Sequence, residues 1–310
     1  MEEKKEAKHE NNEMTEKGEG LYDRYYKWLL VLPAIALIFS IIYLYQFNQQ
    51  NGDIILKDVS LTGGTTITVF DKNTDVAKLG ADLKKDFPDL NIRKISDIIT
   101  GAQLGFLFET KEDAQKTKTA LESYLKYNLT EENSSIEFSG ASLSAGFYQQ
   151  LRFAILLAFC FMAAVVFIIF RSFVPSFAVI LCAFADIVMT IVVVNMLGIS
   201  VSSAGVIAFL MLVGYSVDTD ILLTTRVLRK KEDKINDRLW SSFKTGLTMT
   251  LTSIAAVGIT LIIIYNLSET LRQIFTILLI GLSFDIFNTW ITNVVLLKWY
   301  AEAKQGGKEE

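Results

Sequence analysis

Long apolar runs alternate with charged segments along the chain, and six of the runs are long enough to cross a membrane. A helix needs about 20 apolar residues to span the hydrocarbon core of a bilayer. Charged residues are concentrated instead in residues 1–27, 53–152 and 226–244. The predicted transmembrane helices are residues 28–47, 153–170, 173–197, 199–225, 245–268 and 273–297. The pattern therefore predicts a polytopic α-helical membrane protein.

The first apolar run, residues 28–47, is predicted to be a permanent membrane anchor. It is longer than the apolar core of a signal peptide and is followed by polar residues without a small-residue cleavage site. The preceding residues 1–20 are rich in Glu, Lys and Asn. A segment of that composition buries too little apolar surface to fold, so we expect a disordered tail there. Residues 298–310 are expected to form a second tail.

The polar segment 48–152 has the pattern of a folded domain. Residues 63–70 contain the β-branched run TTITV, which favours a strand. Residues 74–86 place apolar side chains at helical spacing. Further strands are predicted at 91–99, 105–110 and 135–141, and a second helix at 112–126. The order β-α-β-β-α-β predicts a small α+β domain with a ferredoxin-like fold.

Lys and Arg near the helix ends favour one orientation in the cell membrane, because cytoplasmic loops carry an excess of these residues. With both termini in the cytoplasm, residues 226–244 form a basic cytoplasmic loop and residues 48–152 an extracellular domain. The basic residues of this loop are Arg226, Arg229, Lys230, Lys231, Lys234, Arg238 and Lys244. The loop is also a candidate contact for anionic membrane lipids.

Composition argues against several other classes of protein. The net charge of −4 gives no support for nucleic-acid binding. The only cysteines, Cys160 and Cys182, both lie in apolar runs and provide no disulfide framework or metal-ligand spacing. The sequence contains no P-loop, nucleophile elbow, zinc-protease helix or dinucleotide fingerprint. We therefore expect neither an enzyme nor a bound metal or cofactor.

Four aspartates interrupt the apolar runs, namely Asp186, Asp218, Asp220 and Asp285. A charged side chain at the bilayer centre costs about 2.5 to 3.5 kcal/mol, so each needs a polar partner or a role such as proton transfer. Asp218 and Asp220 are about 200° apart around a helix and cannot share a face. The alternative is a structural role, with hydrogen bonds from other helices. Candidate donors to Asp186 and Asp285 are Thr190, Asn195, Asn288, Thr289 and Asn293.

Three short motifs carry a resemblance to a known family. Residues 61–65 read LTGGT, with Gly63 and Gly64 suited to a tight turn, and precede the predicted first strand. Residues 214–220, which begin with Gly214, read GYSVDTD in the fourth predicted helix, and an Ala-Asp pair ends at Asp186 in the third. Together with six helices and one large external loop after the first, these motifs resemble the SecF family.

The sequence departs from the bacterial members of that family at two acidic motifs. The acid of their fourth-helix motif falls on Thr219 here, between Asp218 and Asp220, and Ala185 replaces the histidine of a His-Asp pair. The resemblance still implies a proton-coupling carboxylate in the fourth helix, and Asp218 is favoured over Asp220. It also implies that Lys244 matches an arginine that faces this carboxylate.

The resemblance further implies a partner and a source of energy. SecF pairs with SecD as half of a pseudo-symmetric bundle similar to the RND transporters. It helps to draw unfolded secreted polypeptides from the Sec translocon channel by using the proton-motive force. Two alternatives stay open: an RND-type homodimer that exports a small molecule or a lipid, and a passive scaffold for SecD. The coupling ion is H⁺ or Na⁺.

Overall fold

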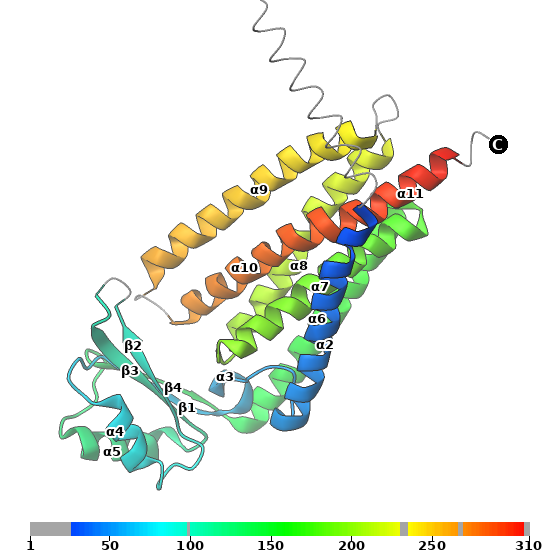
Figure 1. The fold of residues 1–310 in the computed structure, drawn as a ribbon. Helices are drawn as coiled ribbons and strands as arrows, with labels where there is room; N and C mark the ends of the chain where they lie inside the picture. Colours follow the sequence, from blue (N-terminus) through cyan, green and yellow to red (C-terminus); the bar gives the residue numbers. More distant parts are fainter. Residues whose placement is uncertain (1–25, 98–99, 230–234, 266–268, 307–310) are drawn as a thin grey trace, which may run out of the picture.

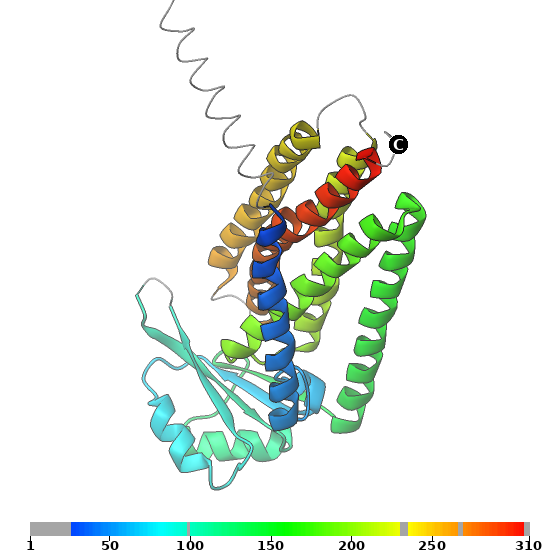
Figure 2. The same ribbon diagram turned by 45° about the vertical axis from the view of Figure 1, so that its right-hand side comes forward.

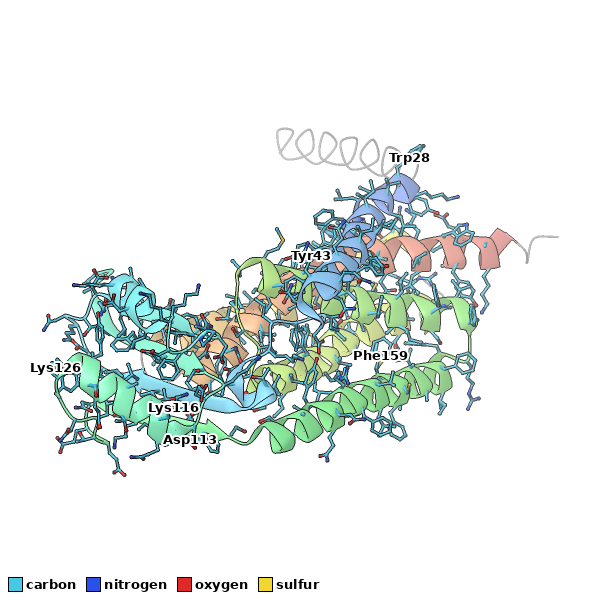
Figure 3. All side chains as sticks on the ribbon, turned by 90° about the horizontal axis from the view of Figure 1, so that it is seen from below. Trp28, Tyr43, Asp113, Lys116, Lys126 and Phe159 are labelled. Carbon is cyan, nitrogen blue, oxygen red and sulfur yellow. The ribbon has the colours of Figure 1, made fainter. Side chains whose placement is uncertain are left out.

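The computed structural model describes residues 26–97, 100–229, 235–265 and 269–306 as a helical bundle with a small domain at one end (Figure 1). Figure 3 shows Lys116 and Lys126 on the small domain, Phe159 on the bundle and Trp28 at the far end of the bundle. The first and last described segments meet at that far end, where the Tyr26 hydroxyl donates to Glu302 Oε2 at 2.6 Å. The predicted tail 1–20 lies outside the described residues.

The described residues contain six candidate membrane spans, by length and composition. The first five are α2 (Val31–Asn51), α6 (Ala141–Phe170), α7 (Phe173–Met196), α8 (Ser203–Arg229) and α9 (Ile235–Ile264). The sixth consists of α10 (Glu269–Phe287), the π-helix η1 (Asn288–Asn293) and α11 (Val294–Gly306). The predicted fold class, six membrane helices with one small α+β domain, is confirmed.

The helices do not end where the apolar runs end. The second span begins at Ala141, well before the predicted residue 153, and α8 and α9 together cover most of the predicted loop 226–244. Residues 230–234 of that loop lie outside the described residues. Lys, Arg and Gln are good helix formers, so hydropathy marks the edge of the membrane and not the end of the helix. Two basic residues of the loop bind within the bundle, since Arg226 donates to Thr245 Oγ1 and Arg238 to the Val227 carbonyl, both at 2.8 Å.

Helices α7 and α8 form the centre of the bundle. Figure 1 shows α9 along one side of them, and Figure 2 shows α6 along the other. The apolar side chains of α2, α6 and α9 are mostly exposed, which suits contact with lipid tails. Small residues allow close contact at the centre: a Cβ on Gly281 of α10 would lie 2.4 Å from Leu212 of α8.

The small domain has the predicted ferredoxin-like order. Its strands are β1 (Gly64–Val69), β2 (Asn91–Ser96), β3 (Gln103–Thr110) and β4 (Ser134–Ser139), in an antiparallel sheet of order β2-β3-β1-β4. Helices α4 (Val76–Leu83) and α5 (Ala114–Leu125) cover one face. The core between them contains Ile67, Phe106, Phe108, Leu79 and Leu121, all fully buried.

Gly63 and Gly64, at the start of β1, form a turn that other residues could adopt only with strain. Gly63 has φ +83° and Gly64 has φ +133°. A Cβ on Gly64 would lie 2.3 Å from the Thr110 carbonyl oxygen on β3. Backbone at this distance cannot move aside as a side chain can, so β1 reaches its place in the sheet only with glycine at residue 64.

The segment between α2 and β1 is fixed to the loop that joins α7 and α8. It contains the short helix α3 (Val59–Thr62). Val201 in that loop donates to the Leu56 carbonyl at 2.6 Å and accepts from the Asp58 backbone N–H at 3.0 Å. Gln273 of α10 accepts a hydrogen bond of 3.0 Å from Ser202 N in the same loop. The base of the small domain is thereby connected to three helices of the bundle.

Candidate functional site

Three aspartates from different helices meet in the centre of the bundle. Asp186 lies on α7, Asp220 on α8 and Asp285 on α10, and each side chain is 0% exposed. Asp186 Oδ2 accepts a hydrogen bond of 2.5 Å from Ser216 of α8. Asp186 Oδ1 accepts one of 2.7 Å from Asn288 of η1. We call these three aspartates the carboxylate cluster.

The π-helix η1 supplies most of the donors to the cluster. Asn293 Nδ2 donates to Asp220 Oδ1 at 2.6 Å. The Thr289 hydroxyl lies 2.9 Å from the same oxygen and 3.3 Å from Asp285 Oδ1, so it connects the two carboxyl groups. A π-helix also leaves some backbone carbonyls outside the regular α-helical ladder. One of them, on Asn288, accepts from the Cys182 thiol at 3.6 Å.

Several oxygens of the cluster lack a hydrogen-bond donor. Asp220 Oδ2 and Asp285 Oδ2 are buried without a partner among the described residues, as are the side-chain oxygens of Asn288 and Asn293. Among the described residues, no Lys or Arg side chain forms an ion pair with any of the three aspartates. Three ionised carboxylates in one buried site would repel each other strongly. A bound proton turns one oxygen into a donor that can reach an unpartnered acceptor.

The candidate donors from the sequence have three different kinds of acceptor. Asn288 donates to Asp186 and Thr289 contacts Asp285, as expected, whereas Asn293 belongs to the cluster through Asp220. Thr190 donates instead to the Asp186 backbone carbonyl at 2.6 Å. Asn195 donates to the Ile54 carbonyl at 2.8 Å and so helps to hold the base of the small domain. Sequence reasoning missed Ser216 as a donor, although it stands in the GYSVDTD motif, where its hydroxyl was the available signal.

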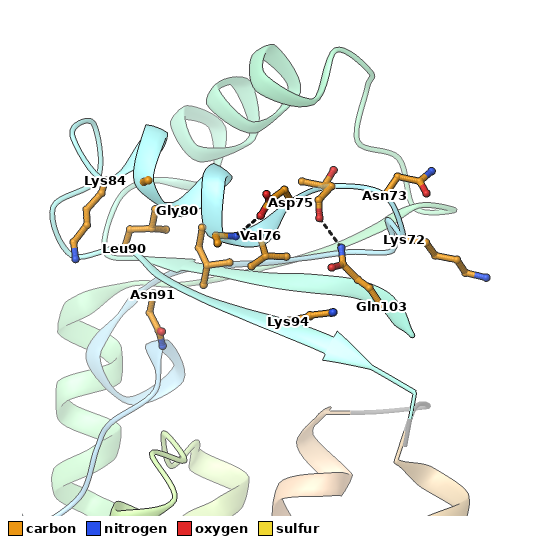
Figure 4. Close-up of a pocket in the computed structure, with 14 residues that line it drawn as sticks. Lys72, Asn73, Asp75, Val76, Gly80, Lys84, Leu90, Asn91, Lys94 and Gln103 are labelled. Atoms are coloured by element: carbon orange, nitrogen blue, oxygen red, sulfur yellow. Dashed lines mark hydrogen bonds between the residues drawn. The ribbon is translucent and has the colours of Figure 1, made fainter. Parts of the chain in front are cut away.

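An open groove on the small domain is separate from this site. It has a volume of about 1040 Å³ and lies between α4 and the edge strand β2, with Lys72, Lys84 and Lys94 at its rim (Figure 4). Its polar groups serve the fold: Gln103 donates to the Thr74 carbonyl at 2.8 Å, and Asp75 caps α4. The groove therefore adds no group to the carboxylate cluster.

Comparison with known proteins identifies the family. Residues 118–303, more than half of the chain, match the family model described as Protein export membrane protein SecD/SecF, C-terminal. The chain belongs to the SecD/SecF family.

Relatives in the SecD/SecF family cover almost the whole chain. The protein-export membrane protein SecF of Methanolacinia petrolearia is 36% identical over 284 residues, which are 91% of this chain and 95% of the relative. The SecF of Methanocaldococcus jannaschii is 37% identical over 281 residues, which are 89% of this chain and 95% of the relative. The resemblance to SecF expected from the short motifs is confirmed.

A solved structure shares the fold. The crystal structure of SecDF, a translocon-associated membrane protein from Thermus thermophilus, superimposes with a TM-score of 0.71 and 16% sequence identity. The match covers 89% of this chain and 38% of the SecDF chain. A second SecDF structure, in a super-membrane-facing form, gives a TM-score of 0.56. This chain therefore spans less than half of the SecDF polypeptide.

The fourth-helix motif of this SecD/SecF family member faces two environments. Ser216 and Asp220 are fully buried in the carboxylate cluster. Asp218 is exposed on the outer side of α8, in a stripe with Met211 and Tyr215, which are 42% and 44% exposed. The rotation of about 200° between residues 218 and 220 produces this division. The sequence favoured Asp218 as the coupling residue, but the intramembrane carboxylates gather around Asp220.

The two remaining motif residues expected at the site lie on its outside. Lys244 of α9 is exposed and stacks on the Trp240 ring, with its nitrogen 5.2 Å from the ring centroid. Within the described part of the chain, Lys244 forms no ion pair with a carboxylate. Gly214 is exposed on the same stripe of α8 as Asp218, and no atom of another described residue lies within 4 Å of a Cβ placed there.

Proposed function

We propose that this chain is the SecF subunit of the protein-export machinery, which acts with SecD and draws on the proton-motive force. Membership of the SecD/SecF family and the names of its relatives support the export role. The use of the proton-motive force is supported by the carboxylate cluster. Three buried acids meet there, and no cation among the described residues is paired with them. Acids of this kind inside a membrane bundle are typical of proton relays.

Within the cluster, Asp220 is proposed as the residue that exchanges the proton. It accepts from Thr289 and Asn293 through one oxygen, while its second oxygen is buried without a donor. Protonation of that second oxygen converts an orphan acceptor into a donor. Deprotonation leaves a charge that only realignment of the helices or entry of water can stabilise. A proton that enters or leaves Asp220 thus favours different packings of α8 against η1.

The outer stripe of α8 is proposed as the contact with SecD. A carboxylate on a lipid-facing surface is costly, whereas a partner subunit can supply polar groups to it. Asp218 stands on this stripe with Gly214, where a small residue allows close approach of another helix. The SecDF chain, of which this chain matches only 38%, supports a second set of helices in the assembly.

The proposed orientation has both termini in the cytoplasm and residues 48–152 outside the cell. The support is the excess of Lys and Arg in residues 226–244. In this orientation the small domain stands where an unfolded secreted polypeptide leaves the Sec translocon channel. The basic segment then lies beside anionic lipid headgroups.

The test is an export assay in membrane vesicles that contain SecD and either Asp220→Asn or Asp218→Asn. Asp220→Asn is expected to abolish the stimulation of export by a proton gradient while SecD still co-purifies. Asp218→Asn, the matched control on the same helix, is expected to retain stimulation wherever the complex stays assembled. Full stimulation with Asp220→Asn would contradict the proposal and favour a passive scaffold for SecD. Stable function without SecD would favour the homodimeric exporter.

A further inference from the structure

Glu109 stands at the joint between the small domain and the bundle, outside the carboxylate cluster. Side chains alternate along a strand, so Phe108 faces α4 and α5 while Glu109 faces the bundle side of the sheet. Glu109 is 5% exposed. Its Oε1 lies 2.7 Å from Arg93 Nη2, and its Oε2 accepts from Asn91 Nδ2 at 2.7 Å.

A second acid meets Glu109 from the bundle side. The Asp58 carboxyl group is within hydrogen-bonding reach of Glu109. Asp58 is held in place because its Oδ1 accepts from Val59 N at 2.5 Å and its backbone N–H donates to the Val201 carbonyl at 3.0 Å. One acid thus belongs to the sheet, and the other belongs to the segment fixed on the α7–α8 loop. Two carboxyl groups within hydrogen-bonding reach of each other attract each other only when they share a proton.

Two cavities border the pair of Glu109 and Asp58. A cavity of about 270 Å³ separates the sheet from the end of the bundle. Its charged lining residues are Arg93, Glu109 and Glu137 of the sheet and Asp58 of the segment before β1, while the membrane helices and the α7–α8 loop contribute uncharged Ser202, Thr270 and Gln273. A second cavity beside Glu109 is lined by the charged residues Lys57, Asp89 and Lys111. Lys57 is paired with Asp53 at 3.1 Å, and Asp89 accepts from the Lys111 backbone N–H at 2.5 Å.

The proton affinity of Glu109 suits exchange near neutral pH. Burial raises the pKa of Glu109 from 4.5 to about 7. The positive charge of Arg93 lowers this pKa, and the Asp58 carboxylate raises it further. Opening of the joint would expose Glu109 to water and return its pKa toward the ordinary value. The closed joint therefore binds the proton more tightly than the open joint. The added stability is complete below about pH 4.5 and is lost as the pH rises from there through about 7.

We propose that Glu109 and Asp58 form a proton-binding site outside the membrane that controls how firmly the small domain is held on the bundle. With the proton bound, one carboxyl group donates to the other across the joint. Without it, two negative charges face each other with Arg93 as the neighbouring cation, and the contact of the domain with the α7–α8 loop weakens. The site is independent of the carboxylate cluster, and in the proposed orientation it responds to the pH outside the cell.

Hydrogen exchange of the full-length chain in lipid nanodiscs tests this inference without any transport assay. The readout is the protection of residues 55–62 and 200–205, corrected for the chemical pH dependence of exchange. With pKa values of about 7 in the closed joint and 4.5 in the open joint, protection is expected to fall about 10-fold from pH 6 to pH 8.5. Glu109→Gln, which keeps hydrogen-bonding groups but cannot titrate, should change less than about 2-fold over the same range.

Glu137→Gln is the matched control, because Glu137 lines the same cavity but has an exposed side chain. It should retain the wild-type pH response. Equal protection of the wild-type joint at both pH values would overturn the proposal, as would an unchanged response in Glu109→Gln. If Glu109→Gln does not fold, the titration of Glu109 can be followed directly by NMR of ¹³C-labelled glutamate in the wild-type chain. A titration midpoint of Glu109 near 7 supports the site, and one near 4.5 overturns it.

Discussion

Asn293 of η1 donates a hydrogen bond of 2.6 Å to Asp220 of α8, joining the last membrane span to the helix that carries the fourth-helix motif of the family. Both side chains are fully buried, and the second oxygen of Asp220 has no donor. The charge state of Asp220 therefore depends on a donor held by a π-helix. Any movement of η1 relative to α8 changes the stability of the ionised form.

The first prediction concerns this donor. Asn293→Leu should lower the free energy of unfolding by about 1–3 kcal/mol, because a buried acceptor loses its partner. It should also reduce gradient-stimulated export. The measurements are thermal unfolding in detergent and the vesicle assay. Thr292→Val is the control, since the buried Thr292 hydroxyl has no partner in the described part of the chain. If both variants behave alike, the hydrogen bond from Asn293 to Asp220 has no specific role.

The second prediction concerns the turn before β1. Gly64→Ala should destabilise the small domain by at least about 1–3 kcal/mol, because the backbone has φ +133° and the new Cβ would meet the Thr110 carbonyl. Faster hydrogen exchange in β1 and β3 is the expected signal. Gly140→Ala is the control, with φ −67° and open space around its Cβ. Unchanged exchange in Gly64→Ala would show that the turn relaxes without cost.

The third prediction separates internal packing from the proposed partner surface. A Cβ on Gly246 of α9 would lie 2.4 Å from the Trp290 ring, so Gly246→Ala should destabilise the chain itself by about 1–3 kcal/mol. Gly214→Leu should leave the thermal unfolding of the isolated chain unchanged, because its surroundings are open. It should nevertheless lower the yield of co-purified SecD about 5-fold or more, equivalent to about 1 kcal/mol at that surface. A normal yield of co-purified SecD with Gly214→Leu would contradict the proposal that this face of α8 contacts SecD.

The fourth prediction concerns pH and the small domain. Although burial acts in the opposite direction, hydrogen bonds from Thr74, Asn73 N and Tyr127 hold the pKa of Asp71 below its ordinary value of 3.8. The stabilisation is present above pH 3.8 and is lost as the pH falls through the lower pKa of the folded state. Protection of the β1–α4 connection should therefore decrease from pH 5 to pH 3.

Asp71→Asn should show a smaller decrease over the same range, because the amide does not titrate. Asp86→Asn changes an exposed aspartate and serves as the control. If Asp86→Asn and Asp71→Asn shift the acid response equally, the hydrogen bonds of Asp71 do not account for it. This response has the opposite sign to that of Glu109, so the two can be told apart within one pH series.

The membrane spans and the small domain could be read from the sequence because each depends on a local pattern. Twenty apolar residues in a row have few stable alternatives to a membrane helix. Alternating β-branched residues and two amphipathic helices likewise specify the sheet and its covered face. The helix ends were less predictable, since polar segments such as residues 141–152 continue a helix beyond the apolar run.

The candidate site was only partly predictable. Asp186, Asp220 and Asp285 stood out in the sequence as charges within apolar runs, and Asn288 and Thr289 were expected donors. The spacing of two residues shows that Asp218 and Asp220 lie on different faces of α8. It does not show which of them points into the bundle, because that depends on how α8 is rotated against its neighbours. Nothing in residues 288–293 indicated a π-helix, whose residues contact α7 and α8 only in the folded bundle.

The sequence by itself determined that this protein spans a membrane six times, carries one ferredoxin-like domain and belongs with SecF, since hydropathy and short motifs are local properties. Only the tertiary structure decided which acids meet. Asp186 and Asp285 lie 99 residues apart in the chain (285 minus 186), and Glu109 and Asp58 come from different parts of the fold. Whether such groups share a site depends on how helices and sheet pack, and packing energy is a sum over long-range contacts that no single segment contains.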